Sequence, residues 1–416
     1  MIYDIIIIGS GISGLNCAYQ LLKNNSFLKI LILEKNDYLG GRIKTHRFKI
    51  NNHNYQFEEG AGRFNQNHKL LLNLLNELNL KKYIVEIGSK ISFYPSTPYE
   101  KKFIDESPFK YINIVIKKSK KIKKEELQKY TFIEFAETIL NKSEIKFILD
   151  SFGYYGELIK MNAYNAIKLF EYDMNSELKF YSLSCGLDKI IKVLVNKIKN
   201  DSKIITNSNV LKINYINNFF TVFTDNNIYQ SKICITAIPK PNLLKLNIYN
   251  DYRYLLKSIT TESLCRIYAI FNKKDIWFKD IGKSTTNNNL RYIIPNDKTN
   301  GLIMISYTDS KFADYWMKLK NKNESLFIEQ LKKDIYKTFN KKIENPIYTK
   351  TCYWKLGIGL WSKNRNSTVL YKKILQPNKN IPLFICGENY SKSQGWIEGA
   401  LETSFDVIKI IKDYEK

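Results

Sequence analysis

Residues 5–33 read IIIIGSGISGLNCAYQLLKNNSFLKILIL, and this stretch decides the fold. The isoleucines Ile5 to Ile8 lead into a glycine-rich turn, apolar residues at helical spacing follow over Leu15 to Leu22, and a second apolar run covers Lys29 to Leu33. A β-branched run predicts a strand, and the helical spacing predicts an amphipathic helix. The stretch therefore predicts a Rossmann-like strand-helix-strand unit in an α/β protein.

The turn of this unit has the G-x-G-x-x-G spacing, with glycines at Gly9, Gly11 and Gly14. In such a turn the first glycine permits the bend, the second lets the backbone approach a pyrophosphate, and the third lets the helix pack on the strand. Glu34 ends the second strand twenty residues after Gly14, at the spacing of an acid that holds ribose hydroxyls. We interpret the unit as a dinucleotide site, and the turn alone does not distinguish NAD from FAD.

The composition limits the class of protein. The 416 residues are 44% hydrophobic and 14% aromatic, which is enough for a large core and excludes overall disorder. The six cysteines have no C-x-x-C spacing, and with three histidines there is no zinc signature, so we expect no metal. No apolar run approaches the ~20 residues of a membrane span, and the β-like run at residues 2–8 has no basic leader before it, so we expect a cytoplasmic protein.

The net charge of +25 raises the question of a nucleic-acid partner, because basic side chains supply phosphate contacts. Only seven of the 65 basic residues are arginine, however, and arginine is the residue that reads guanine and stacks on bases. The densest charge run, residues 117–124, is typical of a solvated surface. These features argue against nucleic-acid binding.

Two distant segments extend the dinucleotide motif. Directly after the ribose acid the chain reads Leu39-Gly40-Gly41-Arg42, and near its end it reads Phe384-Ile385-Cys386-Gly387-Glu388-Asn389 and then Gly395-Trp396-Ile397-Glu398-Gly399-Ala400. This combination resembles the flavin amine oxidase family, which includes monoamine and polyamine oxidases, L-amino-acid oxidases and protoporphyrinogen oxidase. The resemblance implies that the cofactor is FAD and not NAD. It implies non-covalent FAD, because Leu360 aligns with the cysteine that fixes the flavin in monoamine oxidases.

The resemblance also implies two interleaved domains. The FAD-binding domain is expected over 1–65, 180–242 and 353–416, and a mixed α+β substrate domain over 66–179 and 243–352. The first substrate segment is expected to be helical, including a stretch from Phe132 to Phe147. The segment 210–237 is expected to form strands, two of them at 228–230 and 233–237.

The cofactor-binding candidates come from the glycine-rich turn, the ribose acid, the Gly-Gly-Arg segment, a second glycine-rich loop, a middle strand and the carboxyl-terminal motif. They are Gly9, Gly11, Ile12, Ser13, Gly14, Glu34, Lys35, Gly40, Gly41, Arg42, Gly60, Ala61, Gly62, Arg63, Val210, Gly387, Glu388, Gly395, Trp396 and Ile397.

Four residues are catalytic or substrate-binding candidates. Arg63 aligns with the arginine by which L-amino-acid oxidases hold the substrate carboxylate, although pairing with Glu58, Glu59 or a flavin oxygen is an equal alternative. Trp361 and Trp396 align with the two walls of the family's aromatic cage, although such large aromatics also pack in cores. Arg266 stands where the family has a lysine that holds a water near flavin N5, and this departure bears on oxygen reactivity.

The implied reaction is oxidation of a carbon-nitrogen bond in a primary amine or L-amino acid, with hydride transfer to flavin N5, hydrolysis of the imine, and reduction of O2 to hydrogen peroxide. A polyamine oxidase, a desaturase-type flavoenzyme similar to protoporphyrinogen oxidase and a non-catalytic FAD-binding protein are the alternatives. The expected partners are a small amine or amino acid and O2. The oligomeric state is open, with a homodimer as one alternative.

Overall fold

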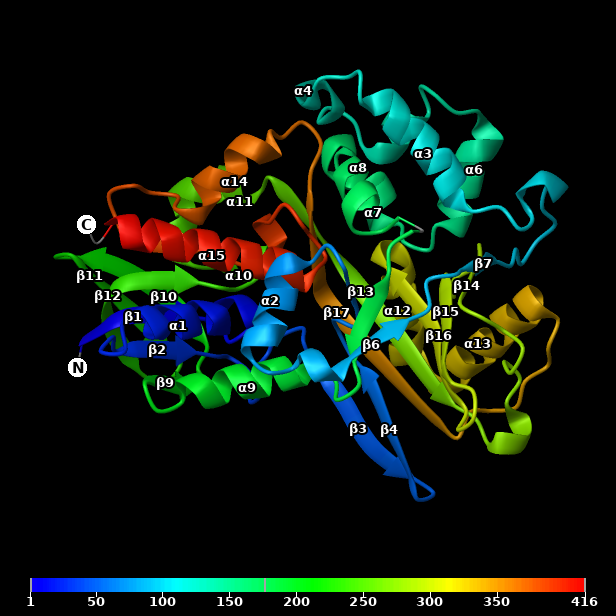
Figure 1. Ribbon diagram of the computed structural model, residues 1–416, viewed down its shortest axis with the longest axis horizontal. Helices are drawn as coiled ribbons and strands as arrows, with labels where there is room; N and C mark the ends of the chain where they lie inside the picture. The colour runs from blue at the N-terminus through cyan, green and yellow to red at the C-terminus, as the bar shows by residue number, and fades with distance from the viewer. Residues whose placement is uncertain (1, 176, 415–416) are drawn as a thin grey trace.

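The computed structural model describes residues 2–175 and 177–414 (Figure 1). Within this part of the chain, the α/β fold contains a seven-stranded sheet with β1 near its centre. Its strands are β1 (Ile2–Ile8), β2 (Ile30–Leu33), β9 (Ser202–Ile205), β10 (Val210–Ile216), β11 (Phe219–Thr224), β12 (Ile228–Thr236) and β18 (Leu383–Ile385). The strand-helix-strand unit predicted from residues 5–33 is confirmed.

The seven-stranded sheet combines parallel and antiparallel pairing. β1 runs parallel to β2 on one side and to β12 on the other, and β10, β11 and β12 form an antiparallel meander. The predicted break between residues 230 and 233 is wrong, because Ser231 is buried and pairs with Tyr3 of β1, so that β12 is continuous. A central strand that is paired on both sides has no reason to end at one buried polar residue.

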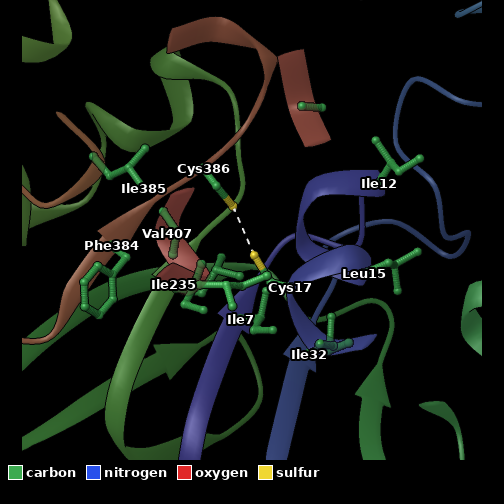
Figure 2. Packing of buried hydrophobic residues seen from close by; sticks show 14 of the residues in the cluster. Ile7, Ile12, Leu15, Cys17, Ile32, Ile235, Phe384, Ile385, Cys386 and Val407 are labelled. Carbon is green, nitrogen blue, oxygen red and sulfur yellow. Dashed lines mark hydrogen bonds between the residues drawn. The ribbon is translucent and has the colours of Figure 1, made fainter. Parts of the chain in front are cut away.

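Three helices share the apolar core of this sheet. They are α1 (Ile12–Asn24), α9 (Asp188–Ile198) and α15 (Ile397–Tyr414), and α1 packs against the other two. Figure 2 shows Cys17 of α1 approaching Cys386, which follows β18, with the two sulfur atoms 3.9 Å apart among buried apolar side chains. The hydrogen bond with Cys386 and burial together raise the pKa of the Cys17 thiol. The first helix and the end of the chain therefore share one core.

A second, six-stranded sheet lies beside the first in Figure 1. Its strands are β7 (Ser92–Phe93), β13 (Ile259–Ile270), β14 (Ser284–Thr285), β15 (Tyr292–Asp297), β16 (Leu302–Asp309) and β17 (Tyr348–Trp361). Helix α12 (Ser310–Lys322) packs on β13 and β16, and α13 (Glu324–Phe339) packs on α12. Most of this sheet packs in apolar cores of its own, while Ile259 of β13 and Trp361 of β17 belong to the core around β1.

Two small sheets connect these parts. A hairpin of β3 (Thr45–Ile50) and β4 (His53–Glu58) extends from the body of the molecule in Figure 1. The other sheet combines β5 (Phe64–Asn65), β6 (Ile84–Ile87) and β8 (Phe180–Leu183), with β8 in the middle. It brings the glycine-rich loop after β4 next to residues from more than a hundred positions later.

The segment between β7 and β8 is helical, as predicted. Its helices are α3 (Pro108–Ser119), α4 (Lys124–Leu127), α5 (Phe132–Ala136), α6 (Lys142–Ser151), α7 (Gly156–Ile159) and α8 (Ala163–Tyr172). The predicted stretch 132–147 is divided into α5 and α6, because Thr131 with Glu134 and Asn141 with Glu144 each form a capping box that starts a new helix.

Two features bear on the predicted domain boundaries, which remain a prediction. β17 pairs with β13 along its length, so a boundary at residue 353 falls inside this strand. Helix α2 (Lys69–Glu77) packs against α15 and belongs to the core around β1, although the sequence assigns it to the substrate domain. The remaining short helices are α10 (Lys240–Leu243), α11 (Arg253–Leu256) and α14 (Ser367–Leu375).

Candidate functional site

A cavity of about 910 Å³ runs from the carboxyl ends of β1 and β2 to the wall between the six-stranded sheet and the inserted helices. Ligands of open α/β sheets bind at the carboxyl ends of the strands. The cavity is also lined by β17, by the loop after β18 and by the glycine-rich loop after β4. Its position therefore agrees with a dinucleotide site that opens into a substrate site.

The structure brings nearly all predicted cofactor-binding candidates to this cavity. The lining candidates are Gly9, Gly11, Ile12, Ser13, Glu34, Lys35, Gly40, Gly41, Arg42, Gly60, Ala61, Gly62, Arg63, Val210, Gly387, Glu388, Gly395, Trp396 and Ile397. Gly14 is outside the lining and supports the turn from behind, because a Cβ atom there would lie 2.1 Å from the carbonyl oxygen of Gly9.

The turn between β1 and α1 leaves room for an anion. A Cβ atom on Gly11 would meet nothing within 4 Å, and α1 begins after Gly11 without a side-chain cap on its first amides. The uncapped start of a helix attracts phosphate through its free N–H groups and its dipole. Glu34 is buried beside the turn and accepts hydrogen bonds from Ser10 and from Asn36. These neighbours fix the orientation of its carboxylate.

Arg42 joins the first motif to the last. Its Nη1 atom donates to the carbonyl oxygen of Gly357 at 2.6 Å and to Oε2 of Glu388 at 2.8 Å. The other carboxylate oxygen of Glu388 accepts from the amides of Gly359 and Gly395. Segments more than 300 residues apart in the sequence are therefore connected through one buried carboxylate at the cavity.

Arg63 faces the cavity among aromatic rings. Its guanidinium carbon lies 4.4 Å from the ring centre of Phe180 and 5.7 Å from that of Trp396, and its Nη2 atom donates to the hydroxyl of Tyr154 at 3.3 Å. Neither Glu58 nor Glu59 forms an ion pair with it in the described part of the chain. The guanidinium therefore has donors available for an anionic group.

Arg266 is also buried at the cavity, and its side chain does not turn to solvent. Its Nη1 atom donates to the carbonyl oxygen of Glu58 at 3.0 Å, and its guanidinium lies 4.5 Å from the ring centre of Tyr307. A Cβ atom on Gly62 would lie 2.8 Å from this guanidinium. The glycine-rich loop thus packs directly on Arg266.

The three tryptophans near this region have different surroundings. Trp396 lines the cavity, with the His68 ring edge-on at 4.8 Å and the Phe180 ring stacked at 6.4 Å. Trp354 also lines it and donates from its indole to the carbonyl oxygen of Glu59. Trp361 lies outside this cavity and borders a second cavity of about 330 Å³.

The predicted pairing of Trp361 with Trp396 therefore needs correction. The Trp361 indole is buried and donates to the carbonyl oxygen of Ser391 at 2.8 Å. Its ring packs edge-on against Tyr390. The position at the end of β17 turns this side chain into the core, so Trp361 does not face Trp396 across the larger cavity.

Several cavity residues were not among the predicted site residues. They are Tyr154, Glu157, Leu169 and Met174 from the helical insertion, with Leu264 and Tyr307 from the six-stranded sheet. None belongs to a short motif, so the sequence carried no local signal for their position. Glu157 is buried, and burial raises its pKa to about 8, with the charge of Asp309 adding to the effect.

The cavity fits the FAD that the sequence predicts. Its volume is in the range of cofactor sites, the first amides of α1 are free for a pyrophosphate, and Glu34 lies where a ribose would be held. Among the described residues, no group of three His, Cys, Asp or Glu side chains could hold a metal ion. Within that same part of the chain, no helix has the length and apolar character that crossing a membrane requires.

Comparison with known protein families gives a match over nearly the whole chain. The family model of flavin containing amine oxidoreductases matches residues 12–407. A probable flavin-containing monoamine oxidase A of Dictyostelium discoideum is 34% identical over 101 residues, which cover 22% of this chain and 21% of that protein. The flavin-containing amine oxidase A of Equus caballus is 33% identical over 92 residues, covering 22% and 16%. The chain thus matches only about a fifth of the length of these relatives.

A double mutant of putrescine oxidase, redesigned in its cofactor binding, has a similar solved structure. The TM-score is 0.76 at 15% sequence identity, over 99% of this chain and 99% of the other. This likeness extends over the FAD-binding and the helical parts and confirms the fold. With the family model matched from the first helix to the last, the chain belongs to the family of flavin-containing amine oxidoreductases, and its cofactor is FAD.

Proposed function

We propose that this protein oxidises the carbon-nitrogen bond of an L-amino acid or a simple primary amine and reduces O2 to hydrogen peroxide. The observation that carries the proposal is the guanidinium of Arg63, which faces the cavity between two aromatic rings and next to the Tyr154 hydroxyl. The free N–H donors of a guanidinium group match the two oxygens of a carboxylate, so amino acids are the preferred substrate class. The non-covalent attachment of FAD, the site residues and the domain boundaries are parts of this proposal.

In this proposal each side chain has a separate task. Arg63 and Tyr154 bind the substrate carboxylate, and the Trp396 ring orients the amine. The apolar walls of Leu169, Leu264 and neighbouring residues exclude water. FAD, when bound, supplies the acceptor for the hydride and the route of both electrons to O2. The overall balance is amine, O2 and water giving a carbonyl product, ammonia and hydrogen peroxide.

The charged residues of the cavity favour this reaction over the desaturase alternative. A desaturase for a porphyrinogen or polyene needs an apolar cavity, whereas the guanidinium groups of Arg63 and Arg266 line this one. A buried charge is costly unless it meets a partner, so the substrate is expected to carry complementary charges.

The test is anaerobic loss of the flavin's visible absorbance in the purified holoprotein. The substrates are pairs that differ only in the carboxylate, such as L-phenylalanine and phenethylamine. Arg63→Met is expected to slow reduction by the amino acid about 100-fold and to change reduction by the amine less than threefold, because it removes only the carboxylate contact. Arg253→Met, which removes an exposed arginine, is the control and should change neither.

Two results contradict the proposal. If the flavin of the wild-type protein stays oxidised with every amino acid and amine, the reaction is wrong. If Arg63→Met slows both members of a pair equally, the carboxylate contact is wrong, and the preference for amino acids is withdrawn.

A further inference from the structure

Glu157 is a buried acid in the cavity wall that the proposed function leaves without a task. It lies in the short helix α7, and its side chain is only 8% exposed although it lines the cavity. Within residues 2–175 and 177–414, its carboxyl group accepts a hydrogen bond from its own backbone amide and from no other residue. A buried carboxyl group in this state is short of hydrogen-bond partners, and the cavity is the side from which a donor can arrive.

The charged groups with the largest effect on Glu157 are acids. They are Asp309 at the end of β16, Glu262 in β13 and Glu388 after β18. Asp309 accepts from the amides of Tyr155 and Gly156, and Glu388 accepts from Arg42 and two backbone amides. These two carboxylates therefore accept hydrogen bonds from other residues, whereas in the described part of the chain Glu157 accepts one only from its own backbone amide.

The acidic surroundings of Glu157 favour a hydrogen-bond donor that carries a positive charge. Three nearby acids attract an ammonium group to Glu157, and Arg63 and Tyr154 line the same cavity. Tyr154 and Glu157 stand three residues apart at the start of α7, so one short segment offers a carboxylate contact and an ammonium contact.

The reaction requires that the substrate's ammonium group lose a proton. An ammonium nitrogen has no lone pair, so its carbon-nitrogen bond cannot become an imine until one proton has left. An alkylamine with a pKa of about 10.4 is neutral in fewer than about one molecule in a thousand at pH 7. A base in the site, with a pKa near the working pH, removes this limit.

We propose that Glu157 accepts the proton which the substrate's ammonium group loses before the carbon-nitrogen bond is oxidised. In this step one N–H bond of the ammonium breaks, an O–H bond forms on the Glu157 carboxylate, and the nitrogen keeps its electron pair. No electron is transferred, and the proton returns to solvent after the product leaves. The inference rests on the proposed amine oxidation and assigns a catalytic residue to it.

The first test measures binding without turnover. Cumylamine has no hydrogen on the carbon that bears its amine, so it binds without being oxidised. Its dissociation constant is measured by the change in flavin absorbance of the holoprotein between pH 6 and 10. In the wild type the affinity should rise with pH and level off near pH 8, where Glu157 becomes ionised. Glu157→Gln should bind about 30-fold more weakly at pH 8 and converge with the wild type by pH 10.

The second test measures anaerobic flavin reduction by an oxidisable alkylamine. Glu157→Gln should reduce its flavin about 100-fold more slowly at pH 7.5 and within about threefold of the wild type at pH 10. A fluorinated analogue, whose amine is already neutral at pH 7.5, should restore the rate of the variant. Asp334→Asn removes another buried acid, which lies on α13 outside the cavity, and should leave both profiles unchanged.

The outcomes separate the two proposals. A wild-type flavin that no amine or amino acid reduces overturns the proposed function. A wild type that is reduced, with a Glu157→Gln variant that keeps the same pH profiles, overturns only the role of Glu157. If the variant does not retain FAD, the pH dependence of flavin reduction in the wild type is the test. A rate that rises with pH to about 8 with the alkylamine, but does not with its fluorinated analogue, supports the inference. The same pH dependence with both substrates overturns it.

Discussion

The glycine-rich turn after β1 and the wall around Arg63 border one cavity but are built in opposite ways. The turn consists of backbone from residues 9–14 and a single acid, Glu34, twenty residues later. The wall consists of side chains from separate segments, with Arg63 in contact with Tyr154, Phe180 and Trp396. A backbone site is encoded in local spacing, whereas a side-chain site exists only after distant elements have come together.

The largest effect should come from filling the backbone site. A Cβ atom on Gly14 would lie 2.1 Å from the carbonyl oxygen of Gly9, which belongs to backbone that cannot move aside. Gly14→Val is therefore expected to lower the free energy of unfolding by about 3 kcal/mol or more, measured by urea denaturation.

Gly11→Ala is the matched control within the same turn. Its Cβ atom would meet nothing within 4 Å, so the unfolding free energy of the FAD-free protein should change by less than about 1 kcal/mol. Its FAD affinity should still fall, because the new methyl group occupies the space in front of the turn. A Gly14→Val protein as stable as the wild type would contradict the close packing of α1 on β1.

The next effect tests the connection between the motif at the start of the chain and the motif at its end. Arg42→Met removes the partner of Glu388, whose side chain is 5% exposed, and leaves its charge with only neutral donors. The expected loss is about 3 kcal/mol of unfolding free energy, with a parallel loss of bound flavin.

Arg47→Met provides the comparison for Arg42→Met. Arg47 pairs with Asp188 near the surface, where its side chain is 38% exposed, so the loss should stay below about 1 kcal/mol. If both variants lose the same unfolding free energy, the buried Arg42–Glu388 pair stabilises the protein no more than an exposed ion pair does.

The difference between local backbone sites and side-chain sites explains which parts of the structure could be predicted from the sequence. The strand-helix-strand unit, the strands between residues 210 and 237 and the helical insertion follow from local periodicity, and the structure confirms them. The cavity positions of Gly40 and Gly387 follow from short motifs. The position of Tyr154 could not be predicted, because it depends on how the helical insertion lies on the six-stranded sheet.

The Trp361 prediction went wrong for a related reason. Trp361 is the last residue of β17, and one position along a strand changes the face to which a side chain points. A sequence pattern alone could not decide whether Trp361 or a neighbour such as Ile358 faces the cavity, and the structure assigns Ile358 to it.

A third prediction concerns Glu58, the last residue of β4. Its carboxylate accepts from the amide of Leu187 and the hydroxyl of Thr45, while its carbonyl oxygen accepts from Arg266. Burial raises the pKa of this carboxyl group to about 7. Because the folded state holds the proton more tightly than the unfolded chain, the stabilisation is complete at low pH and is lost as the pH rises through about 7.

Between pH 5 and 7.5 the wild type should lose about 2 kcal/mol of unfolding free energy through Glu58. Glu58→Gln has no charge to bury and should lack this loss. Urea denaturation of both proteins at the two pH values gives the comparison. Equal pH dependence would show that the carboxyl group of Glu58 is ionised in the folded protein well below pH 7.

The smallest effect separates the two tryptophans that the sequence had paired. Trp361→Phe removes the hydrogen bond from the indole to the carbonyl oxygen of Ser391, so the unfolding free energy should fall by about 1 kcal/mol. Because the Trp361 side chain lies outside the larger cavity, the rate of flavin reduction should change less than threefold. Trp396→Phe leaves the core intact but alters the cavity wall next to Arg63, so it should raise the KM for an amino acid about tenfold. A reversal, with Trp361→Phe damaging the reaction and Trp396→Phe leaving it unchanged, would restore the cage in the form that the sequence suggested. It would also mean that β17 presents the opposite face to the substrate.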